Sequence, residues 1–146
     1  MTQQKIGKGG PVGLVAVTHT DYGHRLLAAA DMILGKQDHT RAVSVDVGVD
    51  TGQTVKLLAQ AIREVDQGGG VMVVTDMFGG TPTNLALSLI GQHPIEVVTG
   101  VNLPMLIKIL SSRSKPLAQL AAEAKTAGVQ GIVVAGEVLR KKVSGE

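Results

Sequence analysis

Cysteine and tryptophan are absent from the 146-residue sequence, and Tyr22 and Phe78 are its only aromatic residues. The absence of cysteine excludes disulfides, thiolate catalysis and cysteine-based zinc sites, and it is compatible with a reducing compartment. The scarcity of aromatic side chains removes the platforms on which nucleic-acid bases stack. A hydrophobic core for this chain must therefore be built from Ala, Val, Leu and Ile.

Excess charge and long apolar runs are also lacking. The formal net charge is only +2, and the basic residues are scattered apart from a short run at residues 140–142, so we expect no nucleic-acid partner. No apolar run reaches the roughly 20 residues that span a bilayer, and residues 1–10 lack the apolar centre of a signal peptide. These absences predict a cytoplasmic protein.

Length and composition predict one domain between two polar ends. A chain of this size buries about 70% of its unfolded surface, so a single core suffices. Residues 1–10 are polar and glycine-rich without periodicity and are expected to form a flexible tail, and residues 139–146 form a charged C-terminal tail. The folded domain is thus expected to span residues 11–138.

Apolar runs of strand length alternate with segments of helical periodicity along this domain. Strands are expected at residues 12–17, 42–47, 71–75 and 95–99, and helices at 22–34, 55–62, 85–90, 103–110 and 117–124. A last apolar run covers residues 132–135. The alternation predicts an α/β fold, a doubly wound and mostly parallel sheet with strand order 2-1-3-4 and helices on both faces.

The stretch at residues 71–84 carries the densest set of signals. An apolar strand ends in Asp76, Gly79 and Gly80 allow a tight turn, and Thr81 followed by Pro82 is typical of a helix start, with Thr as N-cap. A glycine loop before a helix offers backbone N–H groups to an anion such as phosphate. The same pattern is equally typical of a tight turn without any ligand.

His19 is expected to lie opposite Asp76. In a sheet of order 2-1-3-4 the first and third strands are neighbours about 4.8 Å apart, and their carboxyl ends meet at the switch point where ligands bind. A carboxylate on one ring nitrogen would fix the tautomer of His19 and leave the other nitrogen as a base or nucleophile. A phosphoryl group attacked there would find donors at Gly79, Gly80 and Thr81.

Two other readings remain open on the residues alone. His19 could act as a general base oriented by Asp76 without a serine nucleophile of its own, or it could contact the ligand of a passive anion-binding module. The remaining histidines have no spacing typical of metal ligands, so no metal is expected and they are interpreted as surface residues: His24, His39 and His93.

The sequence resembles the EIIA domains of the mannose class of the bacterial phosphoenolpyruvate-dependent sugar phosphotransferase system (PTS). The resemblance covers roughly residues 12–135 and depends on the order and spacing of four segments: 13–19 (GLVAVTH), 30–35 (ADMILG), 75–84 (TDMFGGTPTN) and 100–105 (GVNLPM). It implies a phosphotransferase component in which His19 accepts a phosphoryl group from phospho-HPr and passes it to a separate EIIB protein, with no cofactor.

The resemblance also assigns roles to single residues and an oligomeric state. Asp76 would hold the ring of His19, and Thr81 would help to bind the phosphoryl oxygens. Members of the family form homodimers by exchanging a terminal antiparallel strand, which would here be residues 132–135. The protein would meet a membrane only indirectly, through permease subunits.

One position departs from the family pattern. The family usually has glycine after the histidine, whereas this chain has Thr20 and Asp21. An inward carboxylate would repel a phosphoryl group, so we expect Asp21 to face away from His19. Two alternatives accompany the main hypothesis: a regulatory module that binds partners according to its phosphorylation state without sugar transport, and the phosphoryl-donor subunit of a dihydroxyacetone kinase.

Overall fold

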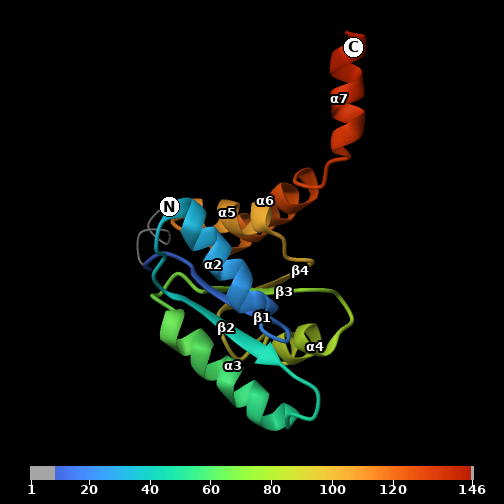
Figure 1. Cartoon of the computed structure of the whole chain (residues 1–146). Coiled ribbons are helices and arrows are strands. Elements are labelled where there is room, and N and C mark those ends of the chain that lie inside the picture. Colours follow the sequence, from blue (N-terminus) through green and yellow to red (C-terminus); the bar gives the residue numbers. More distant parts are fainter. Residues whose placement is uncertain (1–8, 146) are drawn as a thin grey trace.

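The four predicted strands form one parallel sheet in the expected order β2-β1-β3-β4. The computed structural model describes residues 9–145, so residues 1–8 of the predicted tail lie outside the described part (Figure 1). The strands are β1 (Gly13–His19), β2 (Thr40–Val45), β3 (Val71–Thr75) and β4 (Ile95–Thr99). The first strand runs two residues further than predicted, so that His19 is its last residue.

Helices cover both faces of the sheet, as a doubly wound fold requires (Figure 1). One face carries α2 (Tyr22–Leu34), α5 (Leu103–Ser111) and α6 (Leu117–Gln130), and the other carries α3 (Thr51–Val65) and α4 (Thr81–Leu87). Asp50 and Asn102 cap α3 and α5 with their side chains. The fold class is confirmed.

The position of β1 inside the sheet explains why its sequence is apolar without interruption. Leu14 and Ala16 pack into the core cluster under α5 and α6, whereas Val15 and Val17 pack into the cluster under α3. All four side chains are fully buried. A central parallel strand is covered on both faces, so neither set of alternating positions can be polar.

The apolar run at residues 132–135 is not a strand in the single chain. Residues 132–134 have no regular structure, and α7 (Ala135–Ser144) begins at the end of the run and projects away from the sheet (Figure 1). The terminal antiparallel strand was predicted as one exchanged in a dimer, and a single chain does not test that prediction. β-branched residues favour a strand only where an edge is available to pair with, and residues 132–134 pair with neither edge strand of their own sheet.

The start of α4 is displaced by one residue from the predicted position. Gly80, in an extended conformation, is the N-cap, so Thr81 and Pro82 occupy the first two helical positions, and no side chain caps this helix. The predicted cap at Thr81 is wrong because the turn ends one residue earlier. Gly79 takes a left-handed φ of 88°, which glycine adopts without a steric penalty.

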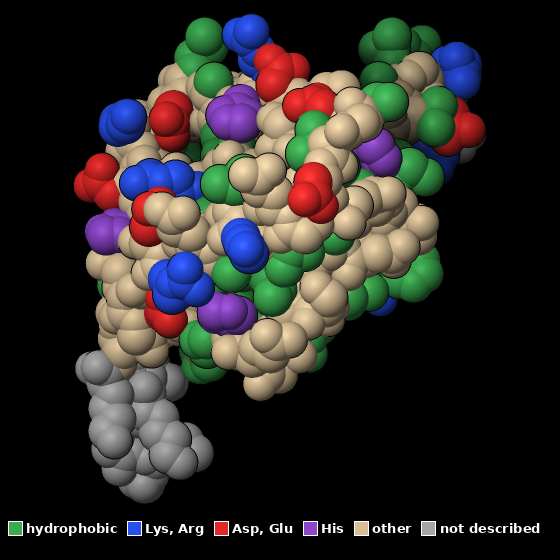
Figure 2. Space-filling model, turned by 90° about the horizontal axis from the view of Figure 1, so that it is seen from below, with side chains coloured by type: hydrophobic (Ala, Val, Ile, Leu, Met, Phe, Trp, Pro, Cys, Tyr) green, Lys and Arg blue, Asp and Glu red, His purple; other side chains and the backbone are tan. Residues whose placement is uncertain are grey.

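Charged side chains are mixed on the face of the molecule that carries α3. Figure 2 shows Lys and Arg side chains lying among Asp and Glu side chains on this face. Among residues 9–145, no helix combines the length and the hydropathy that a bilayer crossing requires.

Candidate functional site

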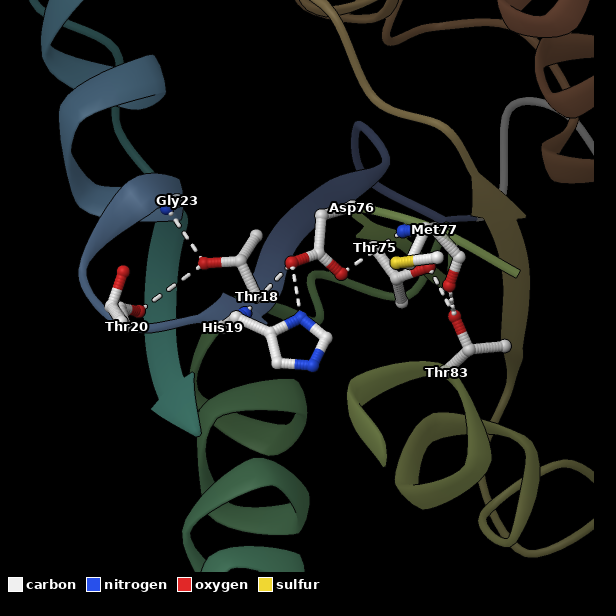
Figure 3. A network of polar contacts seen from close by, with 8 residues as sticks. All are labelled: Thr18, His19, Thr20, Gly23, Thr75, Asp76, Met77 and Thr83. Carbon is white, nitrogen blue, oxygen red and sulfur yellow. Dashed lines mark hydrogen bonds and ion pairs between the residues drawn. The ribbon is translucent and has the colours of Figure 1, made fainter. Parts of the chain in front are cut away.

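His19 and Asp76 meet at the carboxyl edge of the sheet, where β1 and β3 end side by side (Figure 3). The Nδ1 atom of His19 lies 2.7 Å from Oδ2 of Asp76, and the backbone N–H of His19 donates to the same oxygen at 2.8 Å. The second carboxylate oxygen accepts the backbone N–H of Met77 at 2.9 Å. The sequence predicted the side-chain pairing of His19 and Asp76, but it did not predict either backbone contact.

These contacts determine which nitrogen of His19 is free. Burial raises the pKa of Asp76, but the backbone and ring hydrogen bonds from His19, the charge of His19 and the Met77 N–H together lower it below its ordinary value. The ionised carboxylate only accepts hydrogen bonds, so Nδ1 carries the proton and Nε2 keeps its lone pair. Nε2 points away from Asp76 in Figure 3, and the His19 side chain is 49% exposed.

The glycine loop lies against the same imidazole ring. A Cβ atom built on Gly80 would stand 3.1 Å from Cε1 of His19, so only glycine lets the backbone approach the ring this closely without displacement. The N–H groups in the first turn of α4 have no partners within the helix. The structure thus brings Gly80 to the ring of His19 and leaves Gly79 and the adjacent Thr81 exposed to solvent.

The backbone of Met77 is hydrogen-bonded at both its N–H and its carbonyl, a feature that the sequence did not predict. Its N–H donates to Asp76, and its carbonyl accepts the hydroxyl of Thr83 at 2.6 Å. Thr83 uses its only proton in this bond, so the 2.6 Å contact between Thr75 and Thr83 must have Thr75 as the donor. A chain of buried hydroxyls therefore anchors the loop that carries the glycines (Figure 3).

Replacing Thr83 with valine should lower the free energy of unfolding by about 2 kcal/mol, because it leaves the Met77 carbonyl and the Thr75 hydroxyl without this partner. Thr83→Ser keeps the hydroxyl and should recover most of this loss. Urea denaturation of the three proteins is the measurement. Equal stability of Thr83→Val and Thr83→Ser would show that the hydroxyl does not anchor the loop.

The turn after His19 contains Thr20 and Asp21, the two residues that depart from the family pattern. The Asp21 carboxylate contacts Nε of Arg25 at 3.3 Å, one helical turn along α2, and both side chains are largely exposed. Asp21 is thus engaged on its own helix, in agreement with the outward orientation predicted for it. The Thr18 hydroxyl accepts the Gly23 N–H at 2.8 Å and holds the start of α2 against β1.

Thr20 takes a left-handed φ of 51°, a conformation that β-branched residues rarely adopt. Thr20→Gly should therefore raise the free energy of unfolding by up to about 1 kcal/mol, since relief of strain exceeds the added flexibility of the unfolded chain. Thermal unfolding can test this, with Thr20→Ala as the control that retains a Cβ atom. A Thr20→Gly protein less stable than Thr20→Ala would contradict the strain argument.

No group of three or more His, Cys, Asp or Glu side chains within residues 9–145 is arranged to hold a metal ion. Of the remaining histidines, His24 and His39 are exposed and His93 is half-buried, and the three lie on different segments. The carboxyl edge brings together an imidazole oriented by a carboxylate and a glycine loop.

Comparison with known proteins supports the resemblance seen in the sequence. A family model, EIIA-man, described as "PTS system fructose IIA component", matches residues 13–126. The fructose-specific EIIA component of the PTS of Bacillus subtilis is 30% identical over 132 residues, which cover 89% of this chain and 90% of that protein. The mannose-specific EIIAB component of Escherichia coli is 28% identical over 127 residues, and this chain matches only 39% of its length.

Solved structures agree with these matches. The mannose/sorbose-specific IIA subunit of the phosphotransferase system from Enterococcus faecalis superposes with a TM-score of 0.77 at 28% identity, covering 86% of this chain and 95% of that one. The EIIA component from Streptococcus agalactiae superposes with a TM-score of 0.79 at 24% identity, over 86% and 98% of the two chains, and supports the fold.

Proposed function

Since this chain belongs to the EIIA-man family of sugar PTS components, we propose that it carries a phosphoryl group on Nε2 of His19. The group is accepted from phospho-HPr and passed to an EIIB partner for sugar uptake. The observation that carries the proposal is the 2.7 Å contact between Nδ1 and Asp76, which leaves Nε2 as the nucleophile. Family membership itself makes the chain a phosphotransferase component with a phosphoryl-carrier role.

Transfer to His19 exchanges one P–N bond for another. The Nε2 lone pair attacks the phosphorus atom, while the bond to the donor histidine breaks and its electron pair returns to the donor ring. Positive charge develops on the ring of His19 and is stabilised by the Asp76 carboxylate, which keeps its hydrogen bond from Nδ1–H throughout. In this proposal the phosphoryl oxygens are bound by the N–H groups of Gly79, Gly80 and Thr81, and the approach of Gly80 to the ring of His19 supports this role. Delivery to EIIB is the reverse step on a new acceptor.

Exposed apolar residues support a homodimer as the second part of the proposal. Residues 132–134 are apolar and β-branched, and their exposed fractions are 75%, 58% and 61%. Both edges of the four-stranded sheet are free within the described chain. In the proposed dimer each chain adds this segment to the partner's sheet as an antiparallel strand, which buries the exposed side chains.

Incubation with phosphoenolpyruvate, enzyme I and HPr tests the carrier function. We expect an acid-labile phosphoprotein in the wild type and none in His19→Ala. His24→Ala is the matched control, because His24 lies on an exposed face of α2 and makes only a 3.4 Å contact with Ser44. Label that persists in His19→Ala, or no label in the wild type, would refute the proposal.

A further inference from the structure

The loop at residues 76–80 carries Asp76 and both glycines, yet little of it is packed against the core. The side chains of Met77 and Phe78 are largely exposed, and glycine has no side chain to bury. Among the side chains of residues 9–145, only Thr83 donates a hydrogen bond to a carbonyl of this loop, at 2.6 Å to Met77. The position of the loop therefore depends on one hydroxyl more than on apolar packing.

The hydroxyl of Thr83 is itself held in one orientation. The side chain is fully buried, and its oxygen accepts the hydroxyl of Thr75 at 2.6 Å while its proton goes to Met77. Thr75 is the last residue of β3, and its carbonyl accepts the N–H of Val101 after the neighbouring strand. The two hydroxyls thus connect the loop to the end of the sheet.

The backbone of Met77 connects this anchor to the carboxylate of Asp76. The N–H of Met77 donates to Oδ1, and Oδ2 accepts the ring and backbone N–H groups of His19 (Figure 3). Rotation of a carboxylate moves both oxygens together, so the contact at Oδ1 also determines where Oδ2 points. A fixed carbonyl limits the rotation of Met77 and keeps its N–H on Oδ1.

We infer that Thr83 is a positioning residue for phosphoryl transfer: its hydroxyl acts through the Met77 backbone to keep the Asp76 carboxylate aligned with Nδ1 of His19. Thr83 makes its hydrogen bonds to Thr75 and Met77 and none to His19, so it affects the rate through this alignment. A displacement of about 1 Å can slow a reaction about 10²-fold. This inference rests on the proposed phosphorylation of His19.

Single-turnover labelling by phosphorylated HPr provides the first test. Thr83→Val keeps the shape of the side chain without its hydroxyl. It should lower the maximal rate in the folded fraction about tenfold and leave the donor concentration at half-maximal rate unchanged. Thr83→Ser restores the hydroxyl and should react within about twofold of wild type.

Thr54→Val is the matched control for this test. Thr54 is also a buried threonine near the start of a helix, but its hydroxyl donates to the carbonyl of Asp50 at 3.2 Å, the N-cap residue of its own helix. The substitution removes the same group without releasing the loop that carries Asp76. Its rate should therefore stay within about twofold of wild type.

The nitrogen chemical shifts of the His19 ring, measured by NMR, provide a second readout that a loss of stability alone does not change. Thr83→Val should increase the share of the tautomer that carries its proton on Nε2, and Thr54→Val should not. An unchanged rate or an unchanged tautomer in folded Thr83→Val, or an equally slow Thr83→Ser, would overturn the inference and leave the carrier function intact. Absence of label in the wild type would refute the carrier function itself.

Discussion

Replacing Asp76 with asparagine should slow phosphorylation of His19 by up to about 10⁴-fold, the loss observed when the orienting aspartate of a catalytic triad becomes asparagine. Oδ2 of Asp76 accepts both the backbone and the ring N–H of His19, and its negative charge stabilises the ring as positive charge develops. The neutral amide removes this charge, and its NH₂ group favours the tautomer in which Nε2 carries the proton. A protonated Nε2 has no lone pair with which to attack phosphorus.

Single-turnover labelling by phosphorylated HPr measures this effect. Asp31→Asn is the control, because Asp31 also accepts a backbone N–H, from Gln37 at 3.2 Å, but belongs to α2 rather than to the site. The slow variant should still bind the donor, so the loss should appear in the maximal rate rather than in the donor concentration at half-maximal rate. An Asp76→Asn rate within about threefold of wild type would show that the carboxylate does not take part in the reaction.

The lowered pKa of Asp76 also predicts a pH dependence of stability. Its folded-state pKa lies below the ordinary value of 3.8, so the ionised carboxylate contributes stability at pH values above 3.8. This contribution is lost as the pH falls through the folded-state pKa, because the protonated carboxyl no longer attracts the ring. The free energy of unfolding should therefore fall more steeply below about pH 4 in the wild type than in Asp76→Asn. Parallel pH profiles would contradict this assignment.

The strand order could be predicted from the sequence because the pattern of strands and helices leaves few topologies for a doubly wound sheet. Once β1 and β3 are neighbours, His19 and Asp76 must lie near each other, because Val17 is opposite Thr75 in the register and both residues follow within two positions of that pair. The central pair of the site can thus be predicted from the sequence. The pairing did not depend on the exact ends of the strands.

The anchoring of the glycine loop could not be predicted in the same way. Thr75 and Thr83 meet because a strand end and the first turn of a short helix pack together, and that contact depends on where the helix begins. The sequence placed the helix start one residue too late. A buried threonine at a strand end was the available signal, since a buried hydroxyl requires a partner. The strand predicted at residues 132–135 stays a prediction, because a strand exchanged in a dimer pairs with an edge outside the single chain.

Arg113→Met should lower the free energy of unfolding by about 3 kcal/mol, the largest stability effect we expect from a residue outside the aliphatic core. The guanidinium donates to the carbonyls of Val12 at 2.8 Å, Asp38 at 2.8 Å and His39 at 3.0 Å. Burial lowers the pKa of Arg113, an effect that the nearby Asp38 opposes, and the group remains charged. These three bonds join the loop before α6 to the beginnings of β1 and β2.

The rigid fork of the guanidinium explains why lysine should not replace it. An ammonium group at the end of a flexible chain cannot reach three carbonyls at once, so Arg113→Lys should recover only about 1 kcal/mol of the loss. Arg63→Met on the exposed side of α3 is the matched control, and it should change the stability by less than about 0.5 kcal/mol. Urea denaturation of the four proteins gives the comparison. Equal losses in Arg113→Met and Arg63→Met would contradict the role of the three bonds.

The distance of Arg113 from His19 means that a substitution there should change stability without changing the rate of phosphorylation. Arg113 lies at the amino edge of the sheet, and the seven residues of β1 place that edge about 20 Å from His19. The folded fraction of Arg113→Met should therefore be phosphorylated at a rate within about threefold of wild type, although this variant unfolds at a lower urea concentration. Asp76→Asn should show the opposite combination, a slow reaction with a much smaller loss of stability at neutral pH. Because the two edges of one sheet carry different tasks, each variant serves as the control for the other.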